Sequence, residues 1–254
     1  MVINLQYSMG KEDLPFYEET ALAEMYAWLK KVKKKPGILS LLTTGTQQTI
    51  NAVIPEKVHQ AITFAVEKMV KGVLFGNKYL TTKPLKEGSL QLREEKVRRI
   101  IKFYQTTASV EGAVTGAGGI LLGLADFPVF LSIKLKMLFE IASAYGQEVR
   151  NFKERLFLLY VFQLAFSSQE SQNQTIKILE QWDDYAKQLP EDLEAFDWRH
   201  FQLEYRDFMD LAKLAQLIPV VGAGVGAIAN YRLSSRLGDT AMQCFRMRYF
   251  AGQF

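Results

Sequence analysis

The sequence predicts an all-α fold with about nine to eleven helices in a single domain spanning residues 1–254. Apolar residues recur at steps of three and four in most segments, which is the period of one face of a helix. Gly and Pro residues separate these segments, and no convincing run of alternating apolar and polar residues predicts a strand. No low-complexity linker divides the chain. We expect residues 1–12 to be flexible.

The N-terminal half is divided by Pro and Gly residues. A helix over residues 13–35 ends at Pro36-Gly37, and a second covers about 38–53. Pro55 opens a third helix, which ends before a loop at 77–89. A fourth follows over about 90–106. These boundaries rest on residues that favour helix starts and stops, so they predict where each helix ends better than how the helices pack.

The C-terminal half carries clearer capping signals. Asp126 followed by Pro128 favours a helix start, and Gly146 fits the residue just after its end. Asn151 with Glu154 resembles a capping box that opens a buried helix over 152–166. Three more helices are expected at about 176–189, 197–216 and 234–250.

Two glycine-rich apolar segments, 112–128 and 218–233, hold eight of the 17 glycines. Small residues at steps of three and four form one stripe in each segment, which lets helix backbones approach closely. The stripes consist of Gly112, Gly116, Gly119 and Gly123 in the first segment, and of Gly222, Gly226 and Ala229 in the second. Their uncharged runs are shorter than the roughly 20 residues of a membrane span. The two helices are therefore expected either to pack centrally or to form membrane-facing hairpins.

A nucleotide-binding loop is the main alternative for the second segment. Gly222, Gly224 and Ala227 fit the G-x-G-x-x-[GA] pattern, but that pattern needs a strand before it and a second strand after it. Pro219 stands where the first strand would end, and no apolar strand follows. We therefore expect no nucleotide and no cofactor.

The net charge of +4 hides an uneven distribution, because residues 167–197 are acidic. The densest basic cluster comprises Lys30, Lys31, Lys33, Lys34 and Lys35, and a second basic run extends from Lys83 to Lys102. Basic surfaces attract anionic lipid or nucleic acid without sequence specificity. Lysines at the end of a helix also complement its dipole, so a solvated helix end remains an alternative for the first cluster. A basic surface for a membrane or a membrane protein is our prediction, with no nucleic acid partner.

The titratable residues show no catalytic or metal-binding pattern. His59 and His200 are isolated, and the single cysteine, Cys244, has apolar neighbours. One cysteine permits no internal disulfide, which suits a reducing compartment. The N-terminal residues carry no basic segment followed by an apolar one, so we expect no secretory signal and a cytoplasmic location.

Charged and polar residues at the ends of the two glycine-rich segments are candidates to pair with one another. We expect Asp126 to pair with Arg232 or to hydrogen-bond Asn230, because a buried charge needs a partner. The alternative role for Asp126 is a helix N-cap. Four basic residues are candidates to sit at lipid headgroups: Lys134 and Lys136 after the first segment, and Arg232 and Arg236 at the end of the second.

Several segments together resemble the EcsC family over residues 45–250. They are Ile50–His59, Gly112–Pro128, Tyr145-Gly146, Ile218–Arg232, Leu237-Gly238 and Arg246-Met247-Arg248. The family is bacterial and is named from a gene that accompanies an ABC transporter pair. The resemblance implies an accessory role near the cytoplasmic membrane and no catalytic residue.

The resemblance and the residues together favour a non-enzymatic protein peripheral to the membrane or bound to a membrane protein such as an ABC transporter subunit. A hydrolase acting on lipid or peptide through unidentified acidic residues is one alternative. A soluble scaffold without lipid contact is the other.

Overall fold

The computed structural model describes residues 15–33, 56–75, 83–115, 119–191, 193–208 and 223–252. Within these residues every regular element is a helix, which confirms the predicted all-α class. The α-helices are α1 (Phe16–Val32), α3 (Glu56–Phe75), α4 (Leu90–Thr115), α5 (Gly119–Ala144), α6 (Phe152–Phe166), α7 (Gln169–Glu180), α8 (Trp182–Gln188), α9 (Trp198–Phe208) and α11 (Ala223–Phe250), and residues Leu193–Ala195 form a 3-10 turn. The helix predicted at 38–53 lies outside the described residues.

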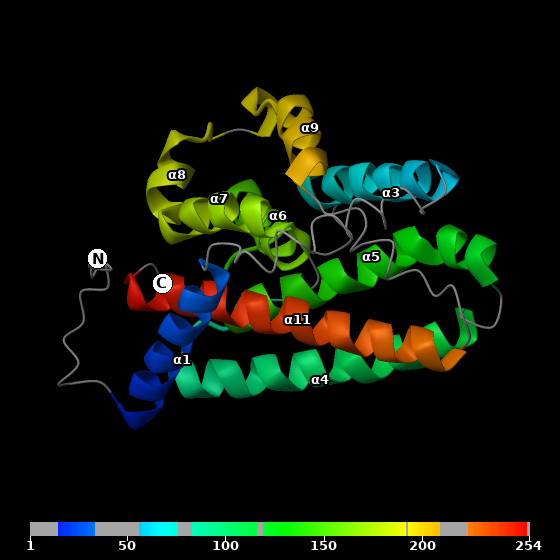
Figure 1. The fold of residues 1–254 in the computed structure, drawn as a ribbon. Helices are drawn as coiled ribbons and strands as arrows, with labels where there is room; N and C mark the ends of the chain where they lie inside the picture. The colour runs from blue at the N-terminus through cyan, green and yellow to red at the C-terminus, as the bar shows by residue number, and fades with distance from the viewer. Residues whose placement is uncertain are drawn as a thin grey trace, which may run out of the picture.

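Three long helices, α4, α5 and α11, lie side by side and form one layer of the molecule (Figure 1). Helix α1 crosses them near the C-terminal end of α11 and contacts both α11 and α4. Helices α4 and α11 run antiparallel, because Glu94 faces Arg246, Ile101 faces Gly238 and Gln105 faces Ser235. This long pairing fixes the outer face of α4 relative to the rest of the chain.

The second layer contains α3, α6 and α7, with α8 and α9 outside it (Figure 1). Helix α6 is its centre, since it contacts α3, α7 and α11 and is buried on every side from Arg155 to Phe166. Aromatic rings fill the space around it: Phe157 packs against both Trp182 and Phe245, at centroid distances of 5.1 and 5.2 Å. A helix that is apolar all round belongs in a core, as the sequence predicted for this segment.

Local signals placed several helix ends correctly. The Asn151 side chain accepts a hydrogen bond from the Lys153 backbone N–H at 2.9 Å and caps α6. Gly146 follows α5 with a φ of +94°, and Gln147 N–H donates to Ala142 O at 2.9 Å. This is the glycine-terminated helix end that the sequence predicted, because only glycine adopts positive φ without strain.

Other predicted boundaries were wrong. Asp126 does not begin a helix: α5 starts at Gly119 and continues through both Asp126 and Pro128. A proline inside a helix removes one backbone hydrogen bond, and the rest of this 26-residue helix is retained. The helix predicted at 176–189 is two helices, α7 and α8, separated at Gln181. Trp182 is buried at the start of α8, so packing of its indole overrides the continuous pattern.

The glycine-rich segments belong to three helices. Gly112 lies in the last turns of α4, Gly119 and Gly123 in the first turns of α5, and Gly226 and Ala229 in α11. Gly116 and Gly222 lie outside the described residues. The structure does not describe the burial of these seven positions, so central packing and membrane contact both stay predictions.

Candidate functional site: the outward face of α4

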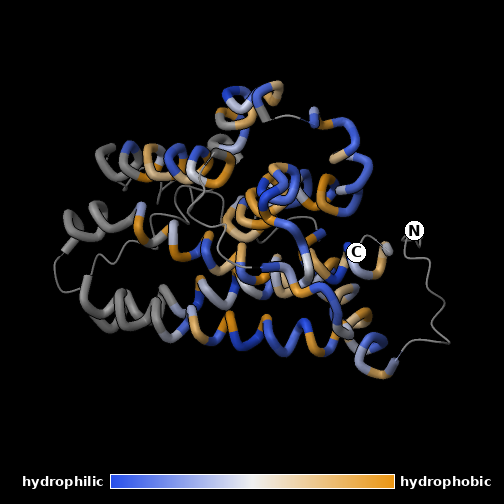
Figure 2. The backbone as a smooth tube through the Cα atoms, turned by 180° about the vertical axis from the view of Figure 1, so that it is seen from behind, coloured by the Kyte–Doolittle hydropathy of each residue, from blue (hydrophilic) through white to orange (hydrophobic). Residues whose placement is uncertain are grey.

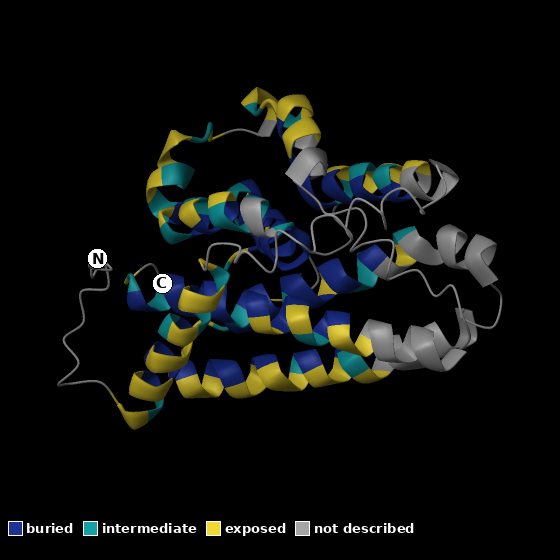
Figure 3. Ribbon diagram, viewed as in Figure 1, coloured by how far each residue is buried: buried dark blue, intermediate teal, exposed yellow. Residues whose placement is uncertain are grey.

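The outward face of α4 carries a stripe of two apolar and two basic side chains. Leu92 and Phe103 are 52% and 60% exposed, and the exposed residues Lys96 and Arg99 lie between them. Steps of four, three and four residues place all four on one face. Figure 3 shows exposed positions along the outer side of α4, and Figure 2 shows hydrophilic and hydrophobic positions alternating along the same helix.

The charge of this face is positive. Lys102 is also exposed beside the stripe, and Glu95 is the exposed acidic residue on this part of α4. The Gln91 side-chain amide donates to Glu95 Oε1 at 3.1 Å. Arg93, part of the same basic run in the sequence, points inward: its guanidinium donates to the backbone oxygens of Gly88 and Leu85 at 3.1 and 3.0 Å. The helical period therefore separates one internal arginine from an external basic surface.

A buried carboxylate holds the inner side of α4 in place. Glu94 is fully buried, and Arg246 of α11 donates to both of its oxygens, Nε to Oε1 and Nη2 to Oε2, each at 2.7 Å. Two tyrosines also donate to Glu94: Tyr17 at 2.7 Å and Tyr145 at 3.3 Å. Because a buried charge needs both an opposite charge and hydrogen bonds, this arrangement satisfies the carboxylate.

The same network joins two other helices, α1 and α11, to α4, together with Tyr145 in the turn after α5. Arg246 also donates from Nη1 to Glu24 Oε2 of α1 at 2.7 Å. Burial acts to lower the pKa of Arg246, but its hydrogen bonds and charge interaction with Glu94 outweigh burial, and the pKa is raised. Burial, with the neighbouring Glu94 charge, raises the pKa of Tyr145 well above its usual range. The network is fully charged at Arg246 and neutral at Tyr145 near neutral pH, so its role is to fix helices rather than to exchange protons.

The role of Glu94 was not predicted from the sequence, although the sequence contains a pattern that indicates it. It occupies one position in the series Leu90, Glu94, Val97, Ile101 and Tyr104, whose other members form the buried face of α4. A lone carboxylate on an otherwise apolar helical face predicts a buried partner of opposite charge. The sequence could not identify that partner, because Arg246 is 152 residues away.

The structure describes three of the five lysines in the first predicted basic cluster. Lys30 and Lys31 occupy the last turn of α1, Lys33 follows it, and all three are exposed. Lys33 Nζ pairs with Glu180 Oε1 of α7 at 2.5 Å. Lys34 and Lys35 lie outside the described residues. Lysines at this helix end complement its dipole, so Lys30 fits the alternative of a solvated helix end.

The predicted pairing of Asp126 stays a prediction, because the side chains of Asp126 and Asn230 are not described. Arg232 is exposed. The role expected for Lys134 at lipid headgroups was wrong: Lys134 is fully buried, and its Nζ donates to Ser234 Oγ of α11 at 2.7 Å. Lys136 is exposed.

The described residues contain neither a membrane-spanning helix nor a cluster of metal ligands. No helix there combines the length and apolar character that crossing a bilayer requires. No three side chains of His, Cys, Asp or Glu in those residues lie together in an arrangement that could hold a metal ion.

Comparison with known proteins decides the family. The model of the EcsC protein family matches residues 19–250, which is most of the chain. The chain belongs to the EcsC family. It is similar to Protein EcsC of Bacillus subtilis (strain 168), with 42% identity over 228 residues that cover 89% of this chain and 94% of the relative. Uncharacterized protein YdbA of the same organism is 27% identical over 258 residues, covering 94% of this chain and 93% of the relative. No solved structure matches the chain.

The EcsC match extends further toward the N-terminus than the resemblance over residues 45–250 indicated. It includes both Glu94 and Arg246, whereas Tyr17 precedes it. The central ion pair and the outward face of α4 thus both lie within the EcsC-family region.

Proposed function

We propose that this EcsC-family protein is a non-enzymatic accessory protein that binds peripherally to anionic lipid on the inner face of the cell membrane. The outward face of α4 is the contact surface. The observation that supports this most directly is the exposed stripe of Leu92, Lys96, Arg99 and Phe103. Basic residues with apolar side chains beside them suit the boundary between headgroups and acyl chains.

The energetics of such a contact are moderate. Each Lys or Arg near an anionic surface contributes about 1 kcal/mol, and the attraction is screened by salt. Apolar side chains such as Leu92 and Phe103 add binding that is less dependent on salt when they enter the interface. A surface of this kind gives reversible association rather than permanent anchoring.

Rigidity of α4 favours this function. The ion pair of Glu94 with Arg246 and the close contact of Ile101 with Gly238 hold the inner side of the helix at two separate points. A helix fixed in this way presents its outer stripe without a cost in ordering the backbone on binding.

Sedimentation with vesicles tests the proposal. The protein is mixed with vesicles of neutral phosphatidylcholine, or of phosphatidylcholine with 30% phosphatidylglycerol, at low and high salt. We expect binding to the anionic vesicles at low salt, and about thirtyfold weaker binding for Lys96→Gln/Arg99→Gln from the loss of two basic residues. Phe103→Ser should weaken binding that persists at high salt.

A matched control is Lys177→Gln/Lys187→Gln, which removes two exposed lysines from α7 and α8 and should bind as the unmodified protein does. If Lys96→Gln/Arg99→Gln binds anionic vesicles as well as the unmodified protein does, the outward face of α4 is not the contact surface. Failure of the unmodified protein to bind lipid, with binding only when a transporter subunit is reconstituted, would replace lipid by a membrane protein as the partner. Release of fatty acid or phosphate headgroup from the vesicles would instead support a hydrolase.

A further inference from the structure

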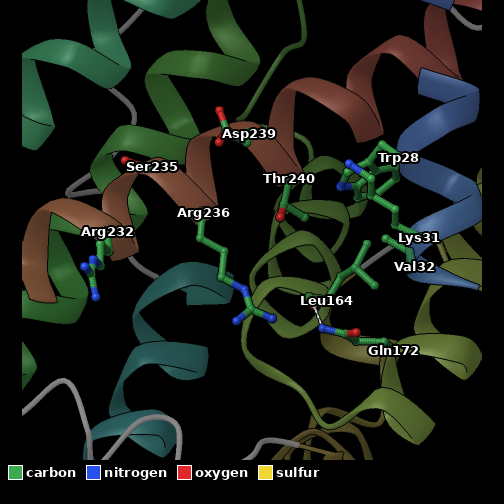
Figure 4. A pocket seen from close by; sticks show the side chains of 10 residues that line it. All are labelled: Trp28, Lys31, Val32, Leu164, Gln172, Arg232, Ser235, Arg236, Asp239 and Thr240. Carbon is green, nitrogen blue, oxygen red and sulfur yellow. Dashed lines mark hydrogen bonds between the residues drawn. The ribbon is translucent and has the colours of Figure 1, made fainter. Parts of the chain in front are cut away.

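A second surface lies on the other side of α11 from α4. A cavity of about 490 Å³ opens between α1, α11 and the α6–α7 pair, and we call it the α11 groove (Figure 4). Cavities of 300–1,000 Å³ are the size of small-molecule sites. Because α11 separates the groove from the outward face of α4, the two surfaces can be tested independently.

Positive charge predominates in the groove. Among the described residues that line it, Lys31 of α1 and Arg232 and Arg236 of α11 stand against one carboxylate, Asp239. The two arginines are one helical turn apart, so they extend from the same side of α11, and Figure 4 shows Asp239 pointing away from them. Neither Lys31 nor Arg232 makes an ion pair with any residue of the described chain.

The groove also has an apolar wall. Trp28 and Val32 of α1 face it from one side and Leu164 of α6 from another. The Gln172 side chain is held against this wall, because its Nε2 donates to Leu164 O at 3.0 Å. A bare inorganic ion would leave the indole and the two aliphatic side chains without contact. The walls therefore fit an anion attached to an apolar group.

We propose that the α11 groove binds an organic phosphate, with the phosphate at Arg232 and Arg236 and its apolar group against Trp28. Guanidinium groups suit phosphate because they donate two parallel hydrogen bonds to its oxygens. Lys31 adds a third positive charge from the facing helix. A soluble phosphate ester and the headgroup of a lipid share this chemistry, and the experiment below separates them.

Calorimetric titration with dihexanoyl phosphatidic acid, kept below its aggregation concentration, tests the groove. We expect binding that dihexanoylglycerol, the neutral counterpart, does not show, and that inorganic phosphate shows at least tenfold more weakly. Arg232→Gln and Arg236→Gln should each weaken binding by about tenfold or more. The fluorescence of Trp28 should change on binding, and Trp28→Phe should abolish that change while Trp182 and Trp198 remain.

The matched control is Arg150→Gln, an exposed arginine outside both surfaces that should leave binding of the soluble probe unchanged. Unchanged far-ultraviolet circular dichroism and melting temperature establish that each variant is folded. Absence of binding to the unmodified protein, or equal affinity for inorganic phosphate and the organic probe, would overturn the proposal. Equal binding of the organic probe by Arg232→Gln/Arg236→Gln and by the unmodified protein would also overturn the proposal.

Vesicles containing phosphatidic acid identify the source of the phosphate. If Arg232→Gln/Arg236→Gln weakens binding to these vesicles, the groove takes a lipid headgroup from the bilayer. If it weakens binding of the soluble probe alone, the groove takes a dissolved phosphate ester. Loss of vesicle binding in Lys96→Gln/Arg99→Gln with intact probe binding would confirm that α4 and the groove act separately.

Discussion

Arg246 holds the buried carboxylate of Glu94 through two hydrogen bonds of 2.7 Å, and this pair joins α11 to α4. Removal of the arginine leaves a fully buried negative charge without its main partner. We expect Arg246→Leu to lower the free energy of unfolding by about 3–5 kcal/mol, as for other broken buried pairs. Urea denaturation measures this loss.

Two further variants isolate the pair interaction. The double variant Glu94→Leu/Arg246→Leu should lose less stability than the sum of the two single variants, because neither charge is left behind. Arg98→Gln is the control: its guanidinium is half exposed and lies 3.3 Å from Glu94 Oε2, so its loss should cost at most about 1 kcal/mol. Strict additivity of the single losses would show that the pair makes no coupled contribution.

Gly238 allows α11 to approach α4 at Ile101. A Cβ at Gly238 would lie 2.6 Å from Ile101 Cγ1, which is too close for a real contact. Alanine normally gains about 1 kcal/mol over glycine in a helix, but overpacking costs about 1–3 kcal/mol. Gly238→Ala should therefore destabilise the protein. With Ile101→Ala already present, the same substitution should stabilise it, and thermal denaturation of the four proteins would reveal this change of sign.

Alkaline pH should destabilise the fold through its buried and half-buried tyrosines. Burial and a hydrogen bond to Glu18 at 2.9 Å raise the pKa of Tyr249 to about 12, from 10.0. The neutral phenol is thus favoured in the folded state. Its contribution to stability is fully present below pH 10 and is lost as pH rises from 10 to about 12.

The measurement for Tyr249 is the free energy of unfolding between pH 8 and pH 11.5, compared with that of Tyr249→Phe. The variant should lose less stability over this range, because it has no phenol to ionise. Other buried tyrosines, among them Tyr104 and Tyr160, shift in the same direction, so part of the alkaline loss should persist. A pH dependence identical in the two proteins would contradict the assigned role of Tyr249.

Cys244 should be unreactive in the folded protein. It is the single cysteine, it is fully buried, and burial raises its pKa, so little thiolate forms. Ellman's reagent at pH 8 should label it only as fast as α11 becomes exposed. Addition of urea should accelerate labelling in parallel with loss of helical signal, whereas fast labelling without denaturant would show that α11 detaches readily.

The sequence predicted those parts of the fold that depend on neighbouring residues. Gly146 and Asn151 marked helix ends correctly because positive φ and capping act over a few residues. Asp126 failed as a helix start because α5 already begins at Gly119, and a local capping signal does not decide a boundary that tertiary context sets. The split between α7 and α8 has a comparable cause in the burial of Trp182.

The candidate site was predictable in part. The basic run that ends at Lys102 was evident, and the helical period alone would have placed Lys96 and Arg99 on one face and Arg93 on another. The α11 groove was not predictable, since Lys31 and Arg236 meet only because two distant helices pack together. A pattern of charges in the sequence predicts which face of a helix is basic, whereas a cavity depends on how distant helices pack together.

The antiparallel partnership of α4 and α11 also constrains how the chain acquires its structure. Glu94 and Arg246 are separated by 152 residues, and Glu18 and Tyr249 by 231. Contacts between such distant positions slow folding, because long loops must close before the contacts form. During synthesis, α1 and α4 leave the ribosome long before α11 exists to cover them. We therefore expect the earlier helices to expose apolar surface until α11 is synthesised, which makes the arrival of α11 the event that closes the fold.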